Sequence, residues 1–326
     1  MGKYLFKRLA LALVVLAALL FTAPALAQQD TSTSGISITP LLAEYTIKPG
    51  QADKLDITLK NVTSGDIIAQ PFVEDFEADD RTGNPVIITD PNNRSPNSIK
   101  NFVSGLEDVP LAKGEQKTVT LAVQTPSNSP PGGYYGVIRY KAVPPNAPAL
   151  EGGDVALSAS VGTIVLITVP GTLTEQVELA GLHVYENDKE AIFFLKQPNK
   201  AGVEIKNLGN GFIKPFGTVE IRNMFGEVVY TYQLNDSNPR ANILPDSSRI
   251  FVNDIKNISK PGRYTMTASV TYGTGGEILV GKKTFWYLPP WLVAIIVVVL
   301  LALIIAVVWA WRRLRHSSRH AHRGRR

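Results

Sequence analysis

The sequence contains no cysteine in its 326 residues. This absence excludes disulfide bonds, thiol nucleophiles and cysteine-bound metals, so any exported domain must be stabilised by hydrophobic burial. Between its two apolar ends the chain also has a single histidine, His183, and no motif of a serine hydrolase, a zinc protease or a phosphate-binding loop. A lone histidine in a strand-like segment is more often structural than catalytic. We therefore expect no enzymatic activity, no cofactor and no metal site.

Segments with helical periodicity are also missing between the apolar ends. Apolar and polar residues alternate instead, for example over 54–60, 118–123 and 264–272. Such alternation is typical of antiparallel strands with one face in a core and the other in water. Turn signals rich in Gly, Pro, Asn and Asp separate these segments. The predicted fold class is all-β: two tandem immunoglobulin-like β-sandwiches followed by a single transmembrane α-helix.

The longest apolar run lies near the C-terminus. Residues 292–310 carry no charge, and at about 1.5 Å per residue they would span a hydrocarbon core of roughly 30 Å. Trp291, Trp309 and Trp311 flank the run as interfacial anchors, and arginines follow it at once. We predict a transmembrane helix over 291–311 and a basic cytoplasmic tail over 312–326. This places the N-terminal part of the mature chain outside the cell membrane.

The N-terminus agrees with that orientation. Three basic residues precede an apolar stretch over 9–21 that is too short to span a membrane comfortably. Residues 25–27 (Ala-Leu-Ala) then have the small-x-small form that a signal peptidase cuts after. We predict a cleaved signal peptide over 1–27, with an uncleaved anchor as the alternative.

The basic character of the chain comes from its two ends. Over 28–290 there are 23 basic and 28 acidic residues, a net charge of −5, whereas the whole chain has a net charge of +5. No basic face remains on the outer part for a nucleic acid, so we expect no nucleic-acid partner. An exported chain without cysteine also suits a bacterial surface better than a secreted eukaryotic protein.

A short internal repeat indicates two related domains. Residues 57–61 (Ile-Thr-Leu-Lys-Asn) match residues 203–207 (Val-Glu-Ile-Lys-Asn), and a Pro-Gly-x-Tyr sequence ends at both Tyr134 and Tyr264. In each copy the tyrosine hydroxyl is expected to bond back to the preceding turn, as in the tyrosine corner of immunoglobulin-like domains. We predict a first domain over 28–171 and a second over 172–288. We expect Tyr134 in the core and Tyr135 facing outward.

Two polar segments of the first domain are candidate sites. The acidic cluster over 74–80 has oxygen ligands at the density that calcium needs, with Asp79, Asp80 and Asn84 as the convergent set. A solvated hairpin that turns at 81–84 is the simpler interpretation, and we prefer it. The polar loop over 89–98 is the candidate partner-binding loop. Its first candidates for contact with a partner are Asp90, Asn92, Asn93 and Arg94.

Several segments resemble one known family. Residues 53–61, 101–104, 110–115 and 130–140 look like the first domain of the WxL-interacting surface proteins of Gram-positive bacteria. That family has a signal peptide, a peptidoglycan-binding-type sandwich, a host-binding-type sandwich, one membrane span and a short basic tail, which is the order predicted here. The resemblance implies a membrane-anchored binding or scaffold protein with an adhesion-type role. Its implied partners are cell-wall polymer or other surface proteins, with the lipid bilayer contacted through the transmembrane helix.

A function of a different class stays open. An accessory, chaperone-like or transport-associated subunit would present the edge of a sheet to an extended segment of an exported client. In the first domain the apolar segment 160–169 is the expected receiving strand.

Overall fold

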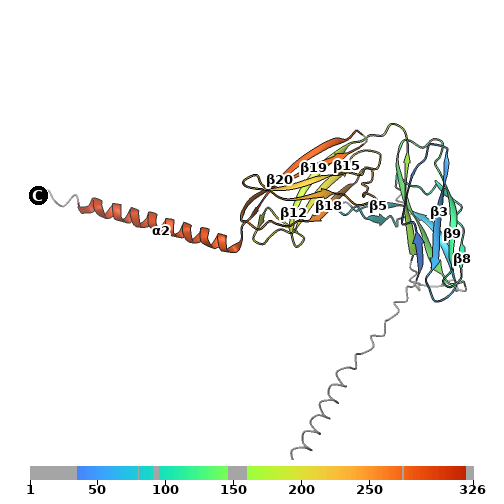
Figure 1. The fold of residues 1–326 in the computed structure, drawn as a ribbon, viewed down its shortest axis with the longest axis horizontal. Helices are drawn as coiled ribbons and strands as arrows, with labels where there is room; N and C mark the ends of the chain where they lie inside the picture. The colour runs from blue at the N-terminus through green and yellow to red at the C-terminus, as the bar shows by residue number, and fades with distance from the viewer. Residues whose placement is uncertain (1–34, 80, 91–94, 146–159, 274, 321–326) are drawn as a thin grey trace, which may run out of the picture.

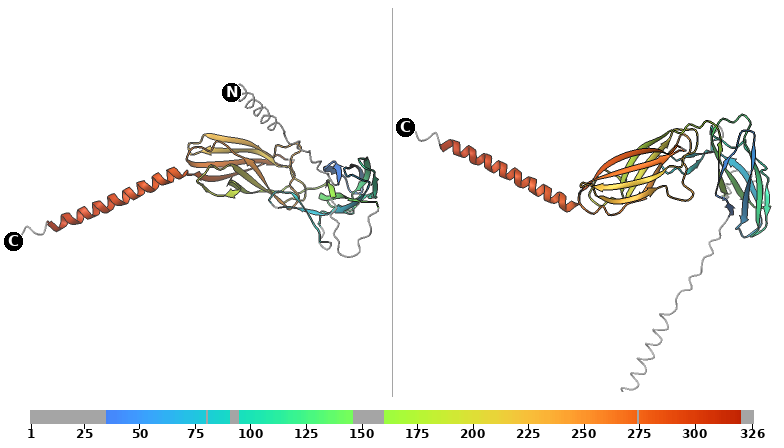
Figure 2. Two further views of the ribbon diagram at one scale, coloured as in Figure 1. Left: turned by 90° about the horizontal axis from the view of Figure 1, so that it is seen from below. Right: turned by 45° about the horizontal axis from the view of Figure 1, so that its top comes forward.

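The computed structural model of the protein describes residues 35–79, 81–90, 95–145, 160–273 and 275–320. In this part of the chain it has twenty strands and one helix, and the predicted all-β class is confirmed. Figure 1 and Figure 2 show two β-sandwiches in succession, followed by the long helix. The predicted signal peptide (1–27) and the end of the predicted tail (321–326) lie outside the described residues.

Domain 1, the first sandwich, packs a sheet of order β1-β3-β9-β7 on a sheet of order β2-β11-β10-β4-β8. A separate two-stranded hairpin, β5–β6, projects from it. The strands are β1 (Ile36–Thr39), β2 (Leu42–Thr46), β3 (Ala52–Asn61), β4 (Ile67–Glu74), β5 (Phe76–Ala78), β6 (Pro85–Ile87), β7 (Val103–Ser104), β8 (Val109–Leu111), β9 (Gln116–Gln124), β10 (Gly132–Val143) and β11 (Ser160–Val169).

Domain 2, the second sandwich, packs a sheet of order β13-β12-β15-β18 on a sheet of order β14-β20-β19-β16-β17. The strands are β12 (Val177–Glu186), β13 (Lys189–Glu190), β14 (Phe193–Phe194), β15 (Lys200–Asn207), β16 (Phe216–Asn223), β17 (Val228–Leu234), β18 (Ser248–Asp254), β19 (Gly262–Tyr272) and β20 (Glu277–Tyr287).

The two domains share one topology. The order β2-β11-β10-β4-β8 of domain 1 corresponds to β14-β20-β19-β16-β17 of domain 2. In both, the last strand of the domain pairs in parallel with a short early strand, β11 with β2 and β20 with β14, whereas its other neighbour is antiparallel. The alternation that predicted strands is also the alternation of burial, since Leu55, Ile57 and Leu59 of β3 are almost fully buried. The internal repeat is therefore a repeat of the whole sandwich.

A buried asparagine ends the repeated strand in each domain. Asn61 closes β3 and Asn207 closes β15, and both are 0% exposed. The side-chain Nδ2 of each donates to three carbonyl oxygens of the neighbouring loops, those of Gly65, Leu111 and Ala112 in domain 1 and those of Gly211, Ile243 and Leu244 in domain 2, at 2.7–3.2 Å. The side-chain Oδ1 accepts the backbone N–H of Thr63 or Gly209. One amide thus fixes the path of two loops.

The predicted tyrosine corners are confirmed in both domains. The hydroxyl of Tyr134 donates to the carbonyl of Pro130 at 3.0 Å, and that of Tyr264 donates to the carbonyl of Lys260 at 2.6 Å. Tyr134 packs on the domain 1 core, as expected. Tyr135 points out of the sandwich but is only 7% exposed, because domain 2 covers it. The expected outward direction of Tyr135 is therefore confirmed, but the side chain meets domain 2 rather than solvent.

Domain 1 and domain 2 meet through a small apolar cluster, the interdomain cluster. Its buried members are Phe76, Tyr135, Val137 and Leu166 of domain 1 and Leu244 of domain 2. The Tyr135 ring lies 5.1 Å from Phe76 and 6.2 Å from Phe212 of domain 2, centre to centre.

Polar contacts beside the interdomain cluster continue the junction. The backbone N–H of Gly133 donates to the carbonyl of Asn210 at 2.7 Å. Glu44 accepts bonds from Lys214 and Asn242 at 2.6 and 2.7 Å. The relative position of the domains therefore depends on these direct contacts rather than on the segment 170–176 that connects β11 to β12.

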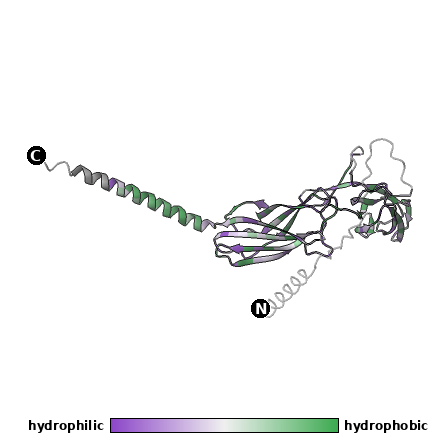
Figure 3. Cartoon of the chain, turned by 90° about the horizontal axis from the view of Figure 1, so that it is seen from above, coloured by the Kyte–Doolittle hydropathy of each residue, from purple (hydrophilic) through white to green (hydrophobic). Residues whose placement is uncertain are grey.

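The helix α2 (Pro290–His320) leaves domain 2 at the end opposite domain 1, as Figure 1 shows. Its segment Pro290–Arg312 is long and apolar enough to cross a membrane by length and composition, and 0% of its most apolar window is buried inside the protein. Figure 3 shows the apolar colouring along this segment. A core helix of a globular domain would be buried, so the exposure favours a membrane span. The location and orientation of the chain stay predictions.

The asparagine networks generate a stability prediction. Asn207→Asp keeps an acceptor but removes the donors to three carbonyls, and we expect a loss of about 3 kcal/mol in the free energy of unfolding. Asn61→Asp is expected to act in the same way on domain 1. Thr58→Ala, which removes an exposed hydroxyl facing Thr118, is the control and should cost about 0.5 kcal/mol or less. Urea unfolding followed by circular dichroism measures the difference, and Asp variants as stable as the control would contradict it.

Candidate functional site

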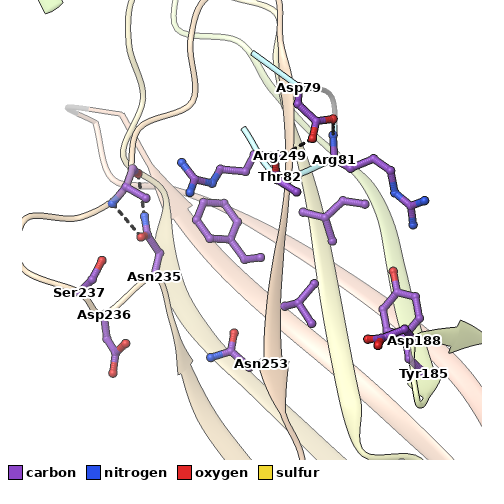
Figure 4. Close-up of a pocket in the computed structure, with 14 residues that line it drawn as sticks. Asp79, Arg81, Thr82, Tyr185, Asp188, Asn235, Asp236, Ser237, Arg249 and Asn253 are labelled. Carbon is purple, nitrogen blue, oxygen red and sulfur yellow. Dashed lines mark hydrogen bonds between the residues drawn. The ribbon is translucent and has the colours of Figure 1, made fainter. Parts of the chain in front are cut away.

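The candidate site is a groove of about 730 Å³ along β18, at the point where the β5–β6 hairpin of domain 1 reaches over domain 2. Figure 4 shows three sides of it. Asp79, Arg81 and Thr82 of the hairpin lie at one end, residues 235–237 at one side, and Tyr185 with Asp188 at the other. We call it the β18 groove.

The hairpin turn is held by its own first carboxylate. Asp79 accepts the backbone N–H of Arg81 at 3.0 Å and the Thr82 hydroxyl at 2.7 Å, and these two bonds hold the pKa of Asp79 below its ordinary value. Gly83 then turns the chain at φ +68°, a region that favours glycine. A Cβ at this position would lie 2.8 Å from Cδ of Arg249, so β18 and the turn touch directly.

Three carboxylates of the acidic cluster have partners within the protein. Glu74 pairs with Arg139, and the buried Asp75 pairs with Lys100 at 3.0 Å. Asp79 caps the turn, whereas Asp80 lies outside the described residues. In the described part of the chain no group of three His, Asp or Glu side chains is placed to hold a metal ion. The hairpin that we preferred for this segment is confirmed.

The outer edge of β18 is open below the hairpin. Backbone bonds from Asn207 to Ser247 and from Ile255 to Asn199 show that odd-numbered residues of this strand face β15. Even-numbered residues therefore turn their N–H and C=O away from β15, because the two directions alternate along a strand. The first of them, the N–H of Ile250, donates to the carbonyl of Arg81 at 2.9 Å.

The next two positions on that edge are Val252 and Asp254. Within the described residues no strand pairs with β18 on this side. In domain 1 the corresponding strand, β9, has β7 as its outer neighbour at Ala122 and Val123, whereas no described strand pairs with this side of β18. The side chain of Val252 is 50% exposed in the groove.

Charges of both signs line the β18 groove. Asp79, Asp188 and Asp236 line it together with Arg81 and Arg249. Asp188 is paired with Lys200 at 2.7 Å, and the half-buried Arg249 donates to the carbonyl of Asn242 at 3.1 Å. Burial lowers the pKa of Arg249, which still stays protonated near neutral pH. Burial raises the pKa of Tyr185, and the charge of Glu190 adds to the rise.

The second wall is a rigid loop that follows β17. Asn235, at φ +51°, donates to the carbonyls of Pro215 and Ala241 at 2.8 and 2.9 Å and accepts the N–H of Ala241. This wall therefore has a fixed position without contact to a partner.

Of the four residues predicted for partner contact, the structure describes only Asp90, which does not line this groove. Asp90 is exposed on the chain that follows β6, and Asn92, Asn93 and Arg94 lie outside the described residues. That site stays a prediction. The groove itself was not predicted, because its walls come from segments that are far apart in the sequence. The sequence shows Val252 only as a strand-forming residue, and its exposure becomes visible in the structure.

The strand expected to receive a client is not an edge strand over most of its length. β11 pairs with β10 on one side and with β2 on the other over Ile164–Thr168. Residues 160–163 and Val169 lack a second neighbour among the described strands. The prediction failed because a short strand, β2, joins this sheet after Pro40 although β1 belongs to the other sheet.

His183 has a structural role. Its Nε2 lies 3.1 Å from Glu204 and its Nδ1 lies 3.0 Å from Glu190, and its ring stacks on Tyr185 at 6.1 Å. No hydroxyl or amine nucleophile is a partner of this imidazole among the described contacts. The absence of enzymatic activity stays a prediction.

Comparison with known proteins gives a likeness of fold. No family model and no curated protein matches the chain, so the resemblance to the WxL-interacting surface proteins stays a prediction. Similar solved structures include the class 5 fimbriae chaperone CfaA, at TM-score 0.39 and 12% identity over 76% of this chain and 99% of that one. The E. coli chaperone DraB has TM-score 0.35 and 15% identity over 78% and 97%. A chain from a chaperone–tip adhesin complex of CFA/I fimbriae biogenesis has TM-score 0.38 and 12% identity over 78% and 100%.

The contact between the hairpin and β18 is testable with two glycines. Gly83→Ala introduces a Cβ against Arg249, whereas Gly114→Ala introduces one at the same kind of φ, +75°, with nothing within 4 Å. Both variants carry a backbone cost of about 1 kcal/mol. Only Gly83→Ala is expected to speed hydrogen exchange of the Ile250 N–H, by about tenfold, because it displaces the turn that covers this group. Equal exchange in the two variants would contradict the contact.

Proposed function

We propose that this protein is a membrane-tethered accessory protein that binds an extended segment of an exported or surface-exposed protein along β18. α2 is the anchor, and the two sandwiches lie outside the cell. The observation that supports the proposal most directly is the open edge at Val252 and Asp254, which faces a groove with rigid walls. This proposal develops the accessory, chaperone-like alternative and moves its receiving strand from β11 to β18.

The backbone of β18 supplies the affinity that the proposal needs. An extended segment laid antiparallel or parallel to the edge would pair with the outward N–H and C=O groups of Val252 and Asp254. Each such bond contributes about 1 kcal/mol net and does not depend on the sequence of the client. An accessory protein that handles several clients requires this kind of contact.

The side chains of the β18 groove would supply selectivity. Val252 and the half-buried Ile250 offer apolar contact to alternate residues of a bound strand. Arg81 at one end of the groove and Asp236 at one side would favour a segment that carries both charges. The hairpin contact at Ile250 sets the register, because it occupies the first outward donor of the strand.

A wall polymer finds less to bind in this groove. Glycan recognition relies on exposed aromatic faces combined with hydrogen-bonding side chains, and the tyrosine of this groove, Tyr185, is only 7% exposed. A strand edge matches a polypeptide better than a sugar chain, because its donors and acceptors repeat at the spacing of a peptide backbone. The adhesion-type function therefore ranks second.

Substitution of Val252 by proline and, as a control, by threonine tests the proposal. Val252→Pro removes the outward N–H but no bond to β15, so an edge strand tolerates it. Val252→Thr keeps the N–H and the strand preference. We expect peptides selected from a phage-displayed random library on the full chain in detergent micelles to bind Val252→Pro about tenfold more weakly, and Val252→Thr within about threefold of the natural chain.

Two further measurements complete this test. Asp254→Pro, which removes the next outward N–H, should weaken the same peptides, and circular dichroism reports whether each variant keeps its fold. Peptides that bind both proline variants as well as the natural chain would refute strand addition at β18. Retention of the chain on isolated cell walls, unchanged in both proline variants, would favour the adhesion-type function instead.

A further inference from the structure

The end of domain 2 from which α2 emerges exposes two apolar loops, which we call the basal loops. The first contains Ile192, Phe193 and Leu195, which are 50%, 65% and 55% exposed. The second contains Met224 and Phe225, which are 53% and 79% exposed. Large apolar side chains in this number at one end of a domain indicate a contact surface.

Both basal loops lie beside the start of the helix. Phe193 and Phe194 pair with Trp286 and Tyr287, the last residues of β20, and the N–H of Leu288 donates to the carbonyl of Phe194 at 2.8 Å. On the other side, β16 ends at Asn223, which pairs with Tyr264 near the start of β19. Since Gly262 of β19 pairs with Tyr287, the second basal loop lies at this same end of the sheet.

The second basal loop is rigid although its apolar side chains are exposed. Asn223 caps the turn by accepting the N–H of Phe225 at 2.9 Å and that of Glu227 at 3.0 Å. Arg222 donates to the carbonyl of Gly226 at 3.0 Å. The turn therefore presents Met224 and Phe225 outward in a fixed geometry, where a flexible loop would fold them back onto the sheet.

The short connection to α2 limits how far the basal loops can be from the bilayer. β20 ends at Tyr287 and the helix begins at Pro290, so only Leu288 and Pro289 intervene. Two to three residues reach at most about 10 Å. The headgroup layer of a bilayer is itself about 5–8 Å thick on each side. Loops at the level of Tyr287 therefore lie at or inside the interface when Trp291 sits at the membrane boundary.

Four exposed basic side chains lie at this end, along with the exposed Glu227 of the second basal loop. Lys196, Lys256, Lys260 and Arg263 are exposed and lie in the segments that connect or begin strands at the base of domain 2. None of them forms an ion pair with another described residue. Cationic side chains around apolar anchors are typical of surfaces that contact anionic lipid headgroups.

We propose that the basal loops insert into the headgroup region of the leaflet that faces domain 2, so that domain 2 docks on the membrane in one orientation. The two loops lie on opposite sides of the point where the chain enters the bilayer. They are separated by about three to four strand spacings, roughly 15–19 Å. The two anchors and the span lie in one row along the end of the five-stranded sheet, so together they restrict the tilt of domain 2 in the plane of that sheet. The inference depends on α2 as a membrane span and not on peptide binding at β18.

Depth measurement on the full chain tests the proposal. The chain has no cysteine, so Phe193→Cys, Phe225→Cys and the control Ile278→Cys each accept one nitroxide label. Ile278 is 65% exposed, as Phe193 is, but lies at the far end of β20. The samples are vesicles of phosphatidylcholine with phosphatidylglycerol as the minor component. We expect labels at 193 and 225 to be at least about fivefold less accessible to a water-soluble nickel reagent than the label at 278.

Three outcomes are informative. Equal nickel accessibility at 193, 225 and 278 would overturn the docking, while carbonate-resistant membrane association in the same sample would still support α2 as the span. Shielding in vesicles that is lost in nanodiscs holding one chain would assign the basal loops to a second copy and would also overturn the proposal. Shielding that persists in single-chain nanodiscs supports lipid. A further variant tests the side chains themselves. The double substitution Phe193→Ser and Phe225→Ser should make a nitroxide label on Lys256→Cys more accessible to the nickel reagent.

Discussion

The interdomain cluster around Tyr135 is the contact on which the rest of the structure depends. The Tyr135 ring packs on Phe76 from the hairpin and lies against Phe212 from domain 2, so one side chain holds three parts of the fold together. Such aromatic pairs add about 0.5–1.5 kcal/mol each beyond the burial of their surface. Since Phe76 begins the hairpin that covers the top of β18, the same cluster that orients the domains also shapes the β18 groove.

The β5–β6 hairpin covers one part of the open edge of β18 and leaves the other part accessible. An unpaired edge strand invites pairing with another copy of the same chain, and proteins commonly block such edges with charged turns. Arg81 and Asp79 belong to such a turn, and one backbone bond to Ile250 anchors it on the strand. Only the lower part of the edge stays accessible, within a groove that has walls on both sides. This geometry disfavours pairing between two flat sheets and leaves room for a single extended segment.

The local features of the fold were predictable from the sequence, but the contacts between distant segments were not. The alternation along β3 and the Pro-Gly-x-Tyr sequences predicted strands and tyrosine corners, because both depend on residues that are close in the chain. The same alternation placed Tyr135 outward, which is correct for an isolated sandwich, and could not reveal that Leu244 and Phe212 cover it. The parallel pairing of β2 with β11 joins residues about 120 apart, so no local pattern could show that the expected edge is occupied. An open edge is defined by what does not pair with it, and that information exists only in three dimensions.

A docked base and a rigid junction together would set the position of the β18 groove relative to the membrane. β20 has 11 residues, and at about 3.4 Å each it gives domain 2 a length of roughly 37 Å along the strands. The groove begins at the far end of the domain, where Arg81 meets Ile250, and runs down β18 toward the base. A domain that swings on a flexible tether samples many orientations, and most of them hold the groove away from a given client. If the basal loops fix the tilt and the interdomain cluster fixes the hairpin, that orientational entropy is lost before binding, and the affinity for a client that leaves the same membrane rises accordingly. In this proposal the apolar surface exposed at the base and the apolar surface buried around Tyr135 would serve one requirement, a groove held in a constant position above the bilayer.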